Sequence, residues 1–111
     1  MENETVLFED ITLLITHYNR SSSLERLLKS FRDKYIRFNE IIVSDDGSNQ
    51  EHLSQLERLK KDYGFQLIPT DKNKGLANNI NKGQRKAHSP YTLYVQEDFI
   101  PSEEFCLRLI D

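Results

Sequence analysis

The sequence predicts an α/β fold, specifically a three-layer sandwich in which helices cover both faces of a mainly parallel sheet. Short apolar runs alternate along the chain with segments whose apolar residues recur at helical spacing. The runs are nearly continuous in their apolar character, as expected of strands covered on both faces. The connections are short and each contains a helix, which favours parallel strands with right-handed crossovers.

The chain has 111 residues, a size that fits one domain. We expect residues 1–10 to form a polar lead-in and residues 11–111 to form the domain. The formal net charge of −3 does not favour nucleic acid as a partner. A single cysteine, Cys106, which we interpret as a packing residue, excludes an internal disulfide and favours a reducing, cytoplasmic location. The sequence has no apolar run of the length that spans a bilayer.

Residues 11–16 form the first predicted strand, and a loop follows at its carboxyl end. Ser22 and Glu25 have the spacing of a capping box, so we expect the first helix to begin beside them. The apolar stripe of this helix comprises Leu24, Leu27, Leu28, Phe31 and Tyr35.

Residues 40–44 form the second predicted strand. Ser48 or Asn49 then caps a second helix, which is expected to end at Gly64. Residues 65–69 form the third strand. The inward face of the second helix comprises Leu53, Leu56, Leu59 and Tyr63.

The last third of the chain contains a predicted helix over 76–88, a fourth strand over 91–95 and a final helix that begins at Ser102. The residues expected to face inward from the helix over 76–88 are Leu76, Ile80 and Ala87.

Acidic side chains directly follow two of these strands. Asp45 and Asp46 follow the second strand, and Glu97 and Asp98 follow the fourth. In open α/β sheets, ligands bind in the crevice at the carboxyl ends of the strands. Adjacent carboxylates repel each other, so their placement suits hydrogen-bond acceptance or a hard cation such as Mn²⁺ or Mg²⁺.

Two further groups complete a candidate nucleotide site. Thr16 ends the first predicted strand and Tyr18 and Asn19 follow it, and an aromatic ring beside hydrogen-bonding groups suits a nucleobase. Lys74 and Gly75 lie where the third helix begins, and free backbone N–H groups there attract phosphate. The residues therefore predict a nucleoside diphosphate held by its base at one end and by a metal bridge at the other.

Each feature also has a plainer interpretation. The Asp-Asp-Gly-Ser sequence at 45–48 is also an ordinary turn with a helix cap, and 96–98 is also a solvated loop. We favour a loop or half-buried position over a ligand role for His17, and a place on the polar face of its helix for His52. We interpret the basic residues around the third helix, which include Lys82, as a face of the helix exposed to solvent.

Four segments together resemble glycosyltransferase family 2. Residues 11–20 are similar to its opening strand, of the form VSVIIPTYNR, and residues 40–49 to its EIIVVDDGST signature. Residues 73–83 resemble its N-x-G-L-x-x-x-x-N-x-G helix. Residues 91–105 resemble its fourth strand, its metal motif and the Leu-Pro-x-x-Phe segment behind that motif. The four segments occur in the family's order.

The resemblance implies a GT-A fold and a UDP- or GDP-sugar donor. Carried over by position, Thr16 and Tyr18 would contact the base and Asp46 would accept a hydrogen bond from it. Asp45 would orient the loop. Ile80 departs from the pattern, since the family often has arginine before the asparagine that follows.

The resemblance also implies a divalent cation, Mn²⁺ or Mg²⁺, which Asp98 would coordinate with Glu97 near it. Gln96 stands where the family has the first acid of its metal motif. The implied chemistry is transfer of a sugar to a saccharide or lipid-linked acceptor in polysaccharide biosynthesis, at the inner face of a membrane in a longer protein. Family domains are about twice this length, so we expect a truncated donor-binding half that is inactive alone and self-associates through exposed edges. We name no catalytic base.

Two other interpretations of the function stay open. A non-catalytic nucleotide-binding or interaction module would keep the fold without turnover, which Gln96 permits. A receiver-type signalling domain also places paired acids at strand ends, but it needs an aspartate that ends a central strand. Here the third strand ends in Pro69, Thr70 and Asp71, and the paired acids end the second strand instead of the first.

Overall fold

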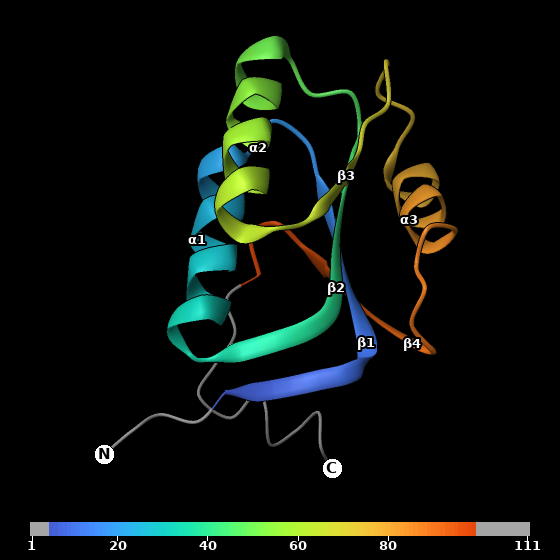
Figure 1. Cartoon of the computed structure of the whole chain (residues 1–111). Coiled ribbons are helices and arrows are strands. Elements are labelled where there is room, and N and C mark those ends of the chain that lie inside the picture. The colour runs from blue at the N-terminus through green and yellow to red at the C-terminus, as the bar shows by residue number, and fades with distance from the viewer. Residues whose placement is uncertain (1–4, 100–111) are drawn as a thin grey trace.

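The structure is a computed structural model that describes residues 5–99, which form a four-stranded sheet with helices on both faces (Figure 1). All three strand pairs are parallel. The three-layer α/β sandwich predicted from the sequence is therefore confirmed. The elements in chain order are β1 (Val6–His17), α1 (Ser21–Asp33), β2 (Ile36–Asp45), α2 (Gln50–Tyr63), β3 (Gln66–Ile68), α3 (Leu76–Gln84) and β4 (Tyr91–Gln96).

The strand order is β3-β2-β1-β4, so the chain first moves outward from β1 and then returns to the other side of β1. Right-handed crossovers that run in opposite directions place their helices on opposite faces of a sheet. Accordingly, α1 and α2 cover one face and α3 covers the other (Figure 1). The topological switch point, where ligands bind in such sheets, therefore lies between β1 and β4.

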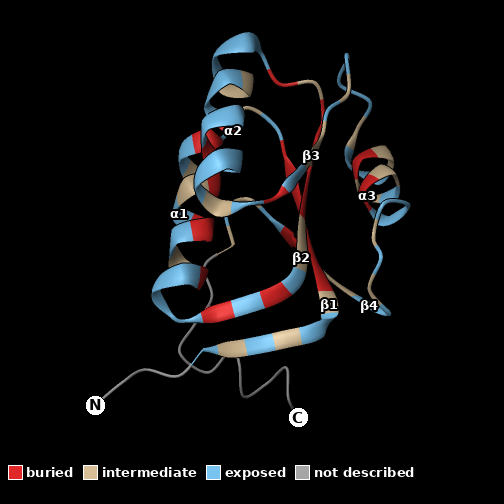
Figure 2. Ribbon diagram, viewed as in Figure 1, coloured by how far each residue is buried: buried red, intermediate tan, exposed pale blue. Residues whose placement is uncertain are grey.

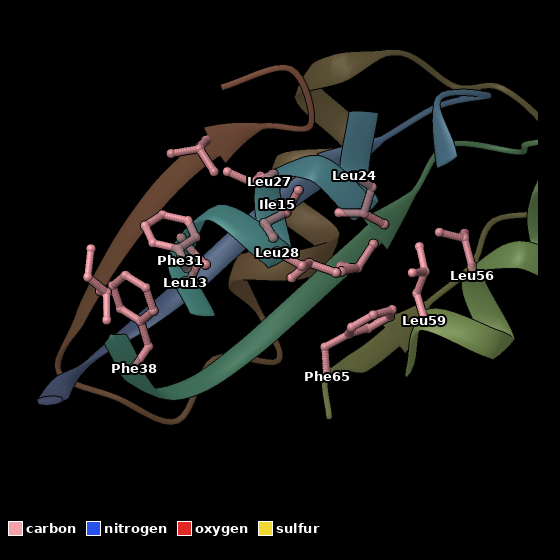
Figure 3. Close-up of a cluster of buried hydrophobic side chains, with 13 residues drawn as sticks. Leu13, Ile15, Leu24, Leu27, Leu28, Phe31, Phe38, Leu56, Leu59 and Phe65 are labelled. Atoms are coloured by element: carbon pink, nitrogen blue, oxygen red, sulfur yellow. The ribbon is translucent and has the colours of Figure 1, made fainter. Parts of the chain in front are cut away.

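The main core lies between the sheet and the pair α1 and α2. Leu13 and Ile15 of β1 point into it (Figure 3). The intervening Leu14 lies against Gly83 of α3, because successive strand side chains alternate between faces. Burial is concentrated along β1 and β2 and on the helix sides that face them (Figure 2). The core contributions of the helices include Leu24, Leu27, Leu28, Phe31, Leu56 and Leu59.

The third helix packs against the sheet mainly through small and polar residues. Of the residues predicted to face inward from it, Ile80 is partly buried, but the prediction is wrong for Leu76. Leu76 is 48% exposed, whereas Asn79 and Gly83 are buried. A Cβ placed on Gly83 would lie 2.3 Å from Cδ1 of Leu14, so the helix backbone approaches the sheet as closely as glycine allows. The helix also ends at Gln84, four residues before its expected end.

Several element boundaries differ from those expected. β1 begins at Val6, so residues 6–10 belong to the first strand and not to a segment ahead of it. α1 begins at Ser21 with Arg20 as its N-cap, and no side chain among the described residues caps it, so the Ser22–Glu25 capping box does not form. At α2 the prediction is confirmed, because Asn49 accepts a hydrogen bond from the backbone N–H of His52.

Gly64 ends α2 in the left-handed conformation, with φ 73°, as predicted. β2 and β4 extend beyond their predicted ranges, and β3 is shorter than predicted. The predicted final helix from Ser102 and Cys106 lie outside the described residues. Within the described part of the chain, no helix has the length and apolar character needed to cross a membrane.

Candidate functional site

The two adjacent aspartates after the apolar run of β2 face opposite sides of the sheet. Asp45 ends the strand on the α1 and α2 side, where it meets His17. Asp46 turns toward the loop that precedes α3. Because neighbouring residues of an extended chain point in opposite directions, the two carboxylates do not share one site. Each instead organises a different loop at the carboxyl edge.

Asp45 is the centre of a buried hydrogen-bond network. Its Oδ1 lies 2.8 Å from Nδ1 of His17, and its Oδ2 accepts from the backbone N–H of Ser48 at 2.9 Å. The Ser48 hydroxyl also donates to Oδ1. Burial by itself would raise the pKa of Asp45, but these hydrogen bonds from His17 and Ser48 outweigh it and hold the pKa below its usual value. The carboxylate therefore stays ionised while fully buried.

His17 links this network to the loop after β1. The expectation of a loop or half-buried histidine is wrong, since His17 ends β1 and is 1% exposed. Its Nε2 accepts a hydrogen bond from the backbone N–H of Arg20 at 3.1 Å. The register of the parallel pair sets His17 directly beside Asp45. The signal in the sequence was that both residues are the last of neighbouring strands.

Asn19 joins the loop after β1 to the loop after β2. Its backbone N–H donates to the hydroxyl of Ser48 at 2.8 Å, and its Oδ1 accepts from the backbone N–H of Asn49 at 2.8 Å. Asn19 has φ 49°, in the left-handed region that asparagine tolerates better than most residues. The two loops are thus held together by side-chain to backbone hydrogen bonds.

Asp46 fixes the loop before α3. Its two carboxylate oxygens accept from the backbone N–H groups of Lys74, at 2.7 Å, and Gly75, at 3.1 Å. The expectation that these N–H groups are free for a phosphate is therefore wrong. Gly47 lies against the same loop, since a Cβ there would come within 2.6 Å of the backbone of Lys72 and Asn73.

Lys82 of α3 connects the carboxyl ends of β2 and β3. Its ammonium donates to the carbonyl of Asp45 at 2.6 Å and to that of Ile68 at 3.0 Å, and also to the hydroxyl of Thr70. Burial lowers its pKa and the nearby charge of Lys74 lowers it further, against the opposing effect of Asp45 and Asp46. The predicted solvated face is wrong for this residue. The position of Lys82 in the helical repeat did not indicate that its ammonium would bind these carbonyls.

Thr16 and Tyr18 differ in exposure. Thr16 is buried, and its hydroxyl lies 3.0 Å from that of Tyr94 on β4, across the switch point. Tyr18 is 43% exposed in the loop after β1. Of the two residues expected to contact a base, only Tyr18 is exposed to solvent.

The acidic turn after β4 lies beside the loop after β1. Glu97 Oε1 is 3.7 Å from Nε of Arg20. Burial raises the pKa of Glu97 and the neighbouring charge of Asp98 adds to this, while a hydrogen bond to the backbone of Glu97 and the charge of Arg20 oppose it. Asp98 is exposed. Within residues 5–99, no group of three or more His, Cys, Asp or Glu side chains is arranged to hold a metal ion.

A cavity of about 610 Å³ lies elsewhere, at the amino end of β2 and the carboxyl ends of α1 and α2. Its lining combines aromatic residues such as Phe31 and Tyr63 with charged residues such as Arg32, Glu40 and Asp62. We place the candidate site at the carboxyl edge instead, because the switch point and the network of buried polar side chains occur together there.

Comparison with known proteins bears on the family and the fold of the chain. The chain matches the sequence family described as Glycosyl transferase family 2 over residues 12–111. A poly-beta-1,6-N-acetyl-D-glucosamine synthase of Staphylococcus epidermidis is 25% identical over 111 residues, which are 100% of this chain and 27% of that protein. The protein of the same name from Staphylococcus aureus strain COL is 28% identical over 103 residues, or 93% of this chain and 25% of that protein. The chain thus spans about a quarter of the length of these relatives.

Solved structures show the same fold. The crystal structure of Staphylococcus aureus TarS 1–349 has a TM-score of 0.72 at 19% identity, covering 91% of this chain and 31% of that one. A mannosyltransferase from Pyrobaculum calidifontis, solved in complex with GDP-Man and Mn²⁺, has a TM-score of 0.69 at 19% identity, with coverage of 94% and 33%. These likenesses confirm the expected GT-A arrangement of the sheet. The match over residues 12–111 shows that this chain belongs to glycosyl transferase family 2.

Proposed function

We propose that this chain binds the nucleoside diphosphate of an activated sugar at the carboxyl edge of its sheet, as the donor site of a glycosyltransferase. The observation that carries the proposal is the meeting of three loops at the switch point. The loop after β1 is bonded to the loop after β2 through Asn19 and Ser48. The same loop approaches the acidic turn after β4 through Arg20 and Glu97.

The base would lie at the loop after β1, where Tyr18 offers an exposed ring for stacking. Thr16 is buried against Tyr94, so its contribution to base contact would require the hydroxyl pair to open toward the ligand. Asp45, Asp46 and Asn19 would shape this site, because their hydrogen bonds fix the loops that form it.

The diphosphate would lie between α3 and the turn after β4. The N–H groups of Lys74 and Gly75 already bind Asp46, so the role proposed for Lys74 passes to its exposed ammonium. Gly75, with φ 96°, would allow the loop its close turn in front of the helix.

Mn²⁺ or Mg²⁺ would bind at Asp98, with Glu97 near it. The residues fit such an ion, because Mg²⁺ is commonly held by one or two carboxylates together with substrate phosphates and does not require a cage of protein ligands. Asp98 is exposed and accessible for this role. When bound, the ion would neutralise charge on the departing nucleoside diphosphate.

The remaining parts of the activity belong to the same proposal. The acceptor would be a saccharide or a lipid-linked sugar, in line with the polysaccharide synthases among the relatives. The protein would act in the cytoplasm, at the inner face of a membrane in its longer form. The base of the donor would be uracil or guanine, and solved relatives include complexes with UDP and with GDP-Man.

Isothermal titration of the 111-residue chain with UDP and with GDP tests the proposal, with Mn²⁺ present or replaced by EDTA. We expect binding of one nucleotide, strengthened by Mn²⁺, and loss of that strengthening in Asp98→Asn. Asp33→Asn, an equally exposed change at the far end of α1, is the matched control and should bind as the wild type does. Binding without metal dependence would favour a non-catalytic nucleotide-binding module. No binding of either nucleotide would contradict the donor site.

A further inference from the structure

We propose that His17 is a positioning residue that holds the loop after β1 in the form required for nucleotide binding. The proposal rests on the nucleotide site described above and adds a residue to it. His17 is 1% exposed, so it acts through its neighbours and not by touching the nucleotide. Those neighbours are Asp45, on the adjacent strand, and Arg20, at the end of the loop, and the Ser48 hydroxyl also lies 3.3 Å from Nδ1.

The hydrogen bonds of His17 select one form of its ring. An ionised carboxylate can only accept hydrogen bonds. In the 2.8 Å contact with Asp45, Nδ1 of His17 must therefore carry a hydrogen and donate it. The backbone N–H of Arg20 donates to Nε2, which must therefore carry a lone pair. Only the neutral imidazole with its hydrogen on Nδ1 satisfies both contacts.

This ring form joins the loop to two other parts of the carboxyl edge. Tyr18 and Asn19 lie between the ring and the Arg20 amide that it binds, so the contact closes a short turn around the residues proposed to meet the base. Arg20 in turn directs its guanidinium toward Glu97 in the acidic turn. A buried ring that only filled space would need no acceptor aimed at the loop.

His52 provides an internal comparison. Its ring centroid lies 6.4 Å from that of His17, and its Nδ1 lies 2.8 Å from the hydroxyl of Ser21 at the start of α1. It therefore supports the beginning of a helix and not the loop with Tyr18. The same substitution at these two histidines separates loop positioning from general support of the fold.

Two substitutions at His17 each remove one of its contacts with Asp45 and Arg20 and can keep the other. In His17→Asn, the amide nitrogen lies near the place of Nδ1 and can still donate to Asp45, but no acceptor reaches Arg20. In His17→Gln, the longer side chain can bring its amide oxygen to the Arg20 N–H, but Asp45 loses the donor. We expect His17→Asn to bind nucleotide about tenfold more weakly than the wild type, which is the effect of losing about one hydrogen bond. We expect His17→Gln to have the lower stability and the nucleotide affinity closer to wild type.

The experiment measures nucleotide affinity by titration with UDP and GDP in Mn²⁺, stability by urea unfolding, and hydrogen exchange of the Arg20 amide by NMR. His52→Asn should lose stability and keep its nucleotide affinity and slow Arg20 exchange. Affinity that follows stability through all three variants, or His17→Asn with wild-type affinity, overturns the proposal. If the wild type binds no nucleotide, the proposed donor site fails, and the Arg20 amide decides the role of His17 by itself. Faster exchange in His17→Asn than in His52→Asn supports that role, and equal exchange overturns it.

Discussion

The carboxylate of Asp46 binds the backbone N–H of Gly75 at 3.1 Å, across the gap between the end of β2 and the start of α3. Its other oxygen binds the N–H of Lys74. An internal anion therefore occupies two N–H donors just before the helix, where backbone N–H groups ordinarily attract an external anion. This side chain fixes the position of the loop before α3 relative to the sheet.

Replacing Asp46 with asparagine should loosen this loop. The amide oxygen can accept one of the two N–H groups, but the amide NH₂ then faces the other donor. We expect Asp46→Asn to lower the free energy of unfolding by about 1 kcal/mol, because one partly buried N–H group is left without an acceptor. Urea unfolding followed by circular dichroism measures the change. Asp71→Asn, an exposed substitution in the same loop, should leave stability unchanged. Equal stability of the two variants would contradict the role of Asp46.

Two glycines with similar positive φ angles should respond differently to alanine. Gly47 has φ 77° and Gly64 has φ 73°, so both substitutions incur the cost of a left-handed alanine, about 1 kcal/mol. A Cβ at Gly64 meets nothing within 4 Å among the described atoms, whereas at Gly47 it would lie 2.6 Å from backbone atoms of Lys72 and Asn73. We expect Gly47→Ala to lose about 2 kcal/mol more than Gly64→Ala, because rigid backbone must move. Thermal unfolding of the two variants tests this difference, and equal losses would show that the two loops are not packed as described.

Lys82 should contribute to stability through hydrogen bonds and not through its charge on the surface. Lys82→Met keeps most of the apolar stem and leaves the carbonyls of Asp45 and Ile68 without their donor. We expect a loss of about 2 kcal/mol in the free energy of unfolding. Lys86→Met, at an exposed position just beyond the same helix, should cost less than about 0.5 kcal/mol. A loss of the same size in both variants would indicate that Lys82 acts only by general electrostatics.

The parts of the fold that follow from local pattern were predictable from the sequence. The apolar run from Ile11 and the acids after Val43 place a strand and a sheet edge without knowledge of any partner. The first half of β1 was not predictable, because Val6 and Phe8 stand among polar residues and become a strand through pairing with Ile36 and Phe38. That pairing is a tertiary effect, which local propensity does not contain.

The inward face of α3 was missed for a different reason. Hydrophobic spacing selects Leu76 as an inward residue, but close approach of the helix to the sheet selects Gly83 for its lack of a side chain. Asn79 is buried because its side-chain oxygen and backbone carbonyl accept from the hydroxyl of Ser44. Composition and periodicity do not reveal how closely a helix approaches a sheet. They also do not reveal a polar pair that is buried between the two.

In the candidate site, the sequence indicated the acids but not the direction in which they point. The resemblance implied different roles for Asp45 and Asp46, but the sequence did not show that Asp45 would bind His17 and Asp46 the backbone before α3. His17 could have been found by aligning the ends of the two parallel strands, since it lies opposite Asp45. The contact of Arg20 with Glu97 depends on the strand order, which places β4 beside β1.

The buried carboxylate of Asp45 should make part of the stability depend on pH. Its hydrogen bonds hold its folded-state pKa below the value near 3.9 that an aspartate has in an unfolded chain. A depressed pKa contributes stability that is fully present above the unfolded value and is lost as pH falls toward the folded value. Asp45→Asn removes this titration together with about 1–3 kcal/mol of stability at pH 7. The advantage of the wild type over this variant should therefore be constant between about pH 7 and pH 5 and shrink below about pH 4. Urea unfolding of both proteins across this range measures the difference between their free energies of unfolding. Groups that titrate in the same way in both proteins do not contribute to this difference. A difference that stays constant down to pH 3 would mean that the Asp45 carboxylate has no depressed pKa in the folded chain.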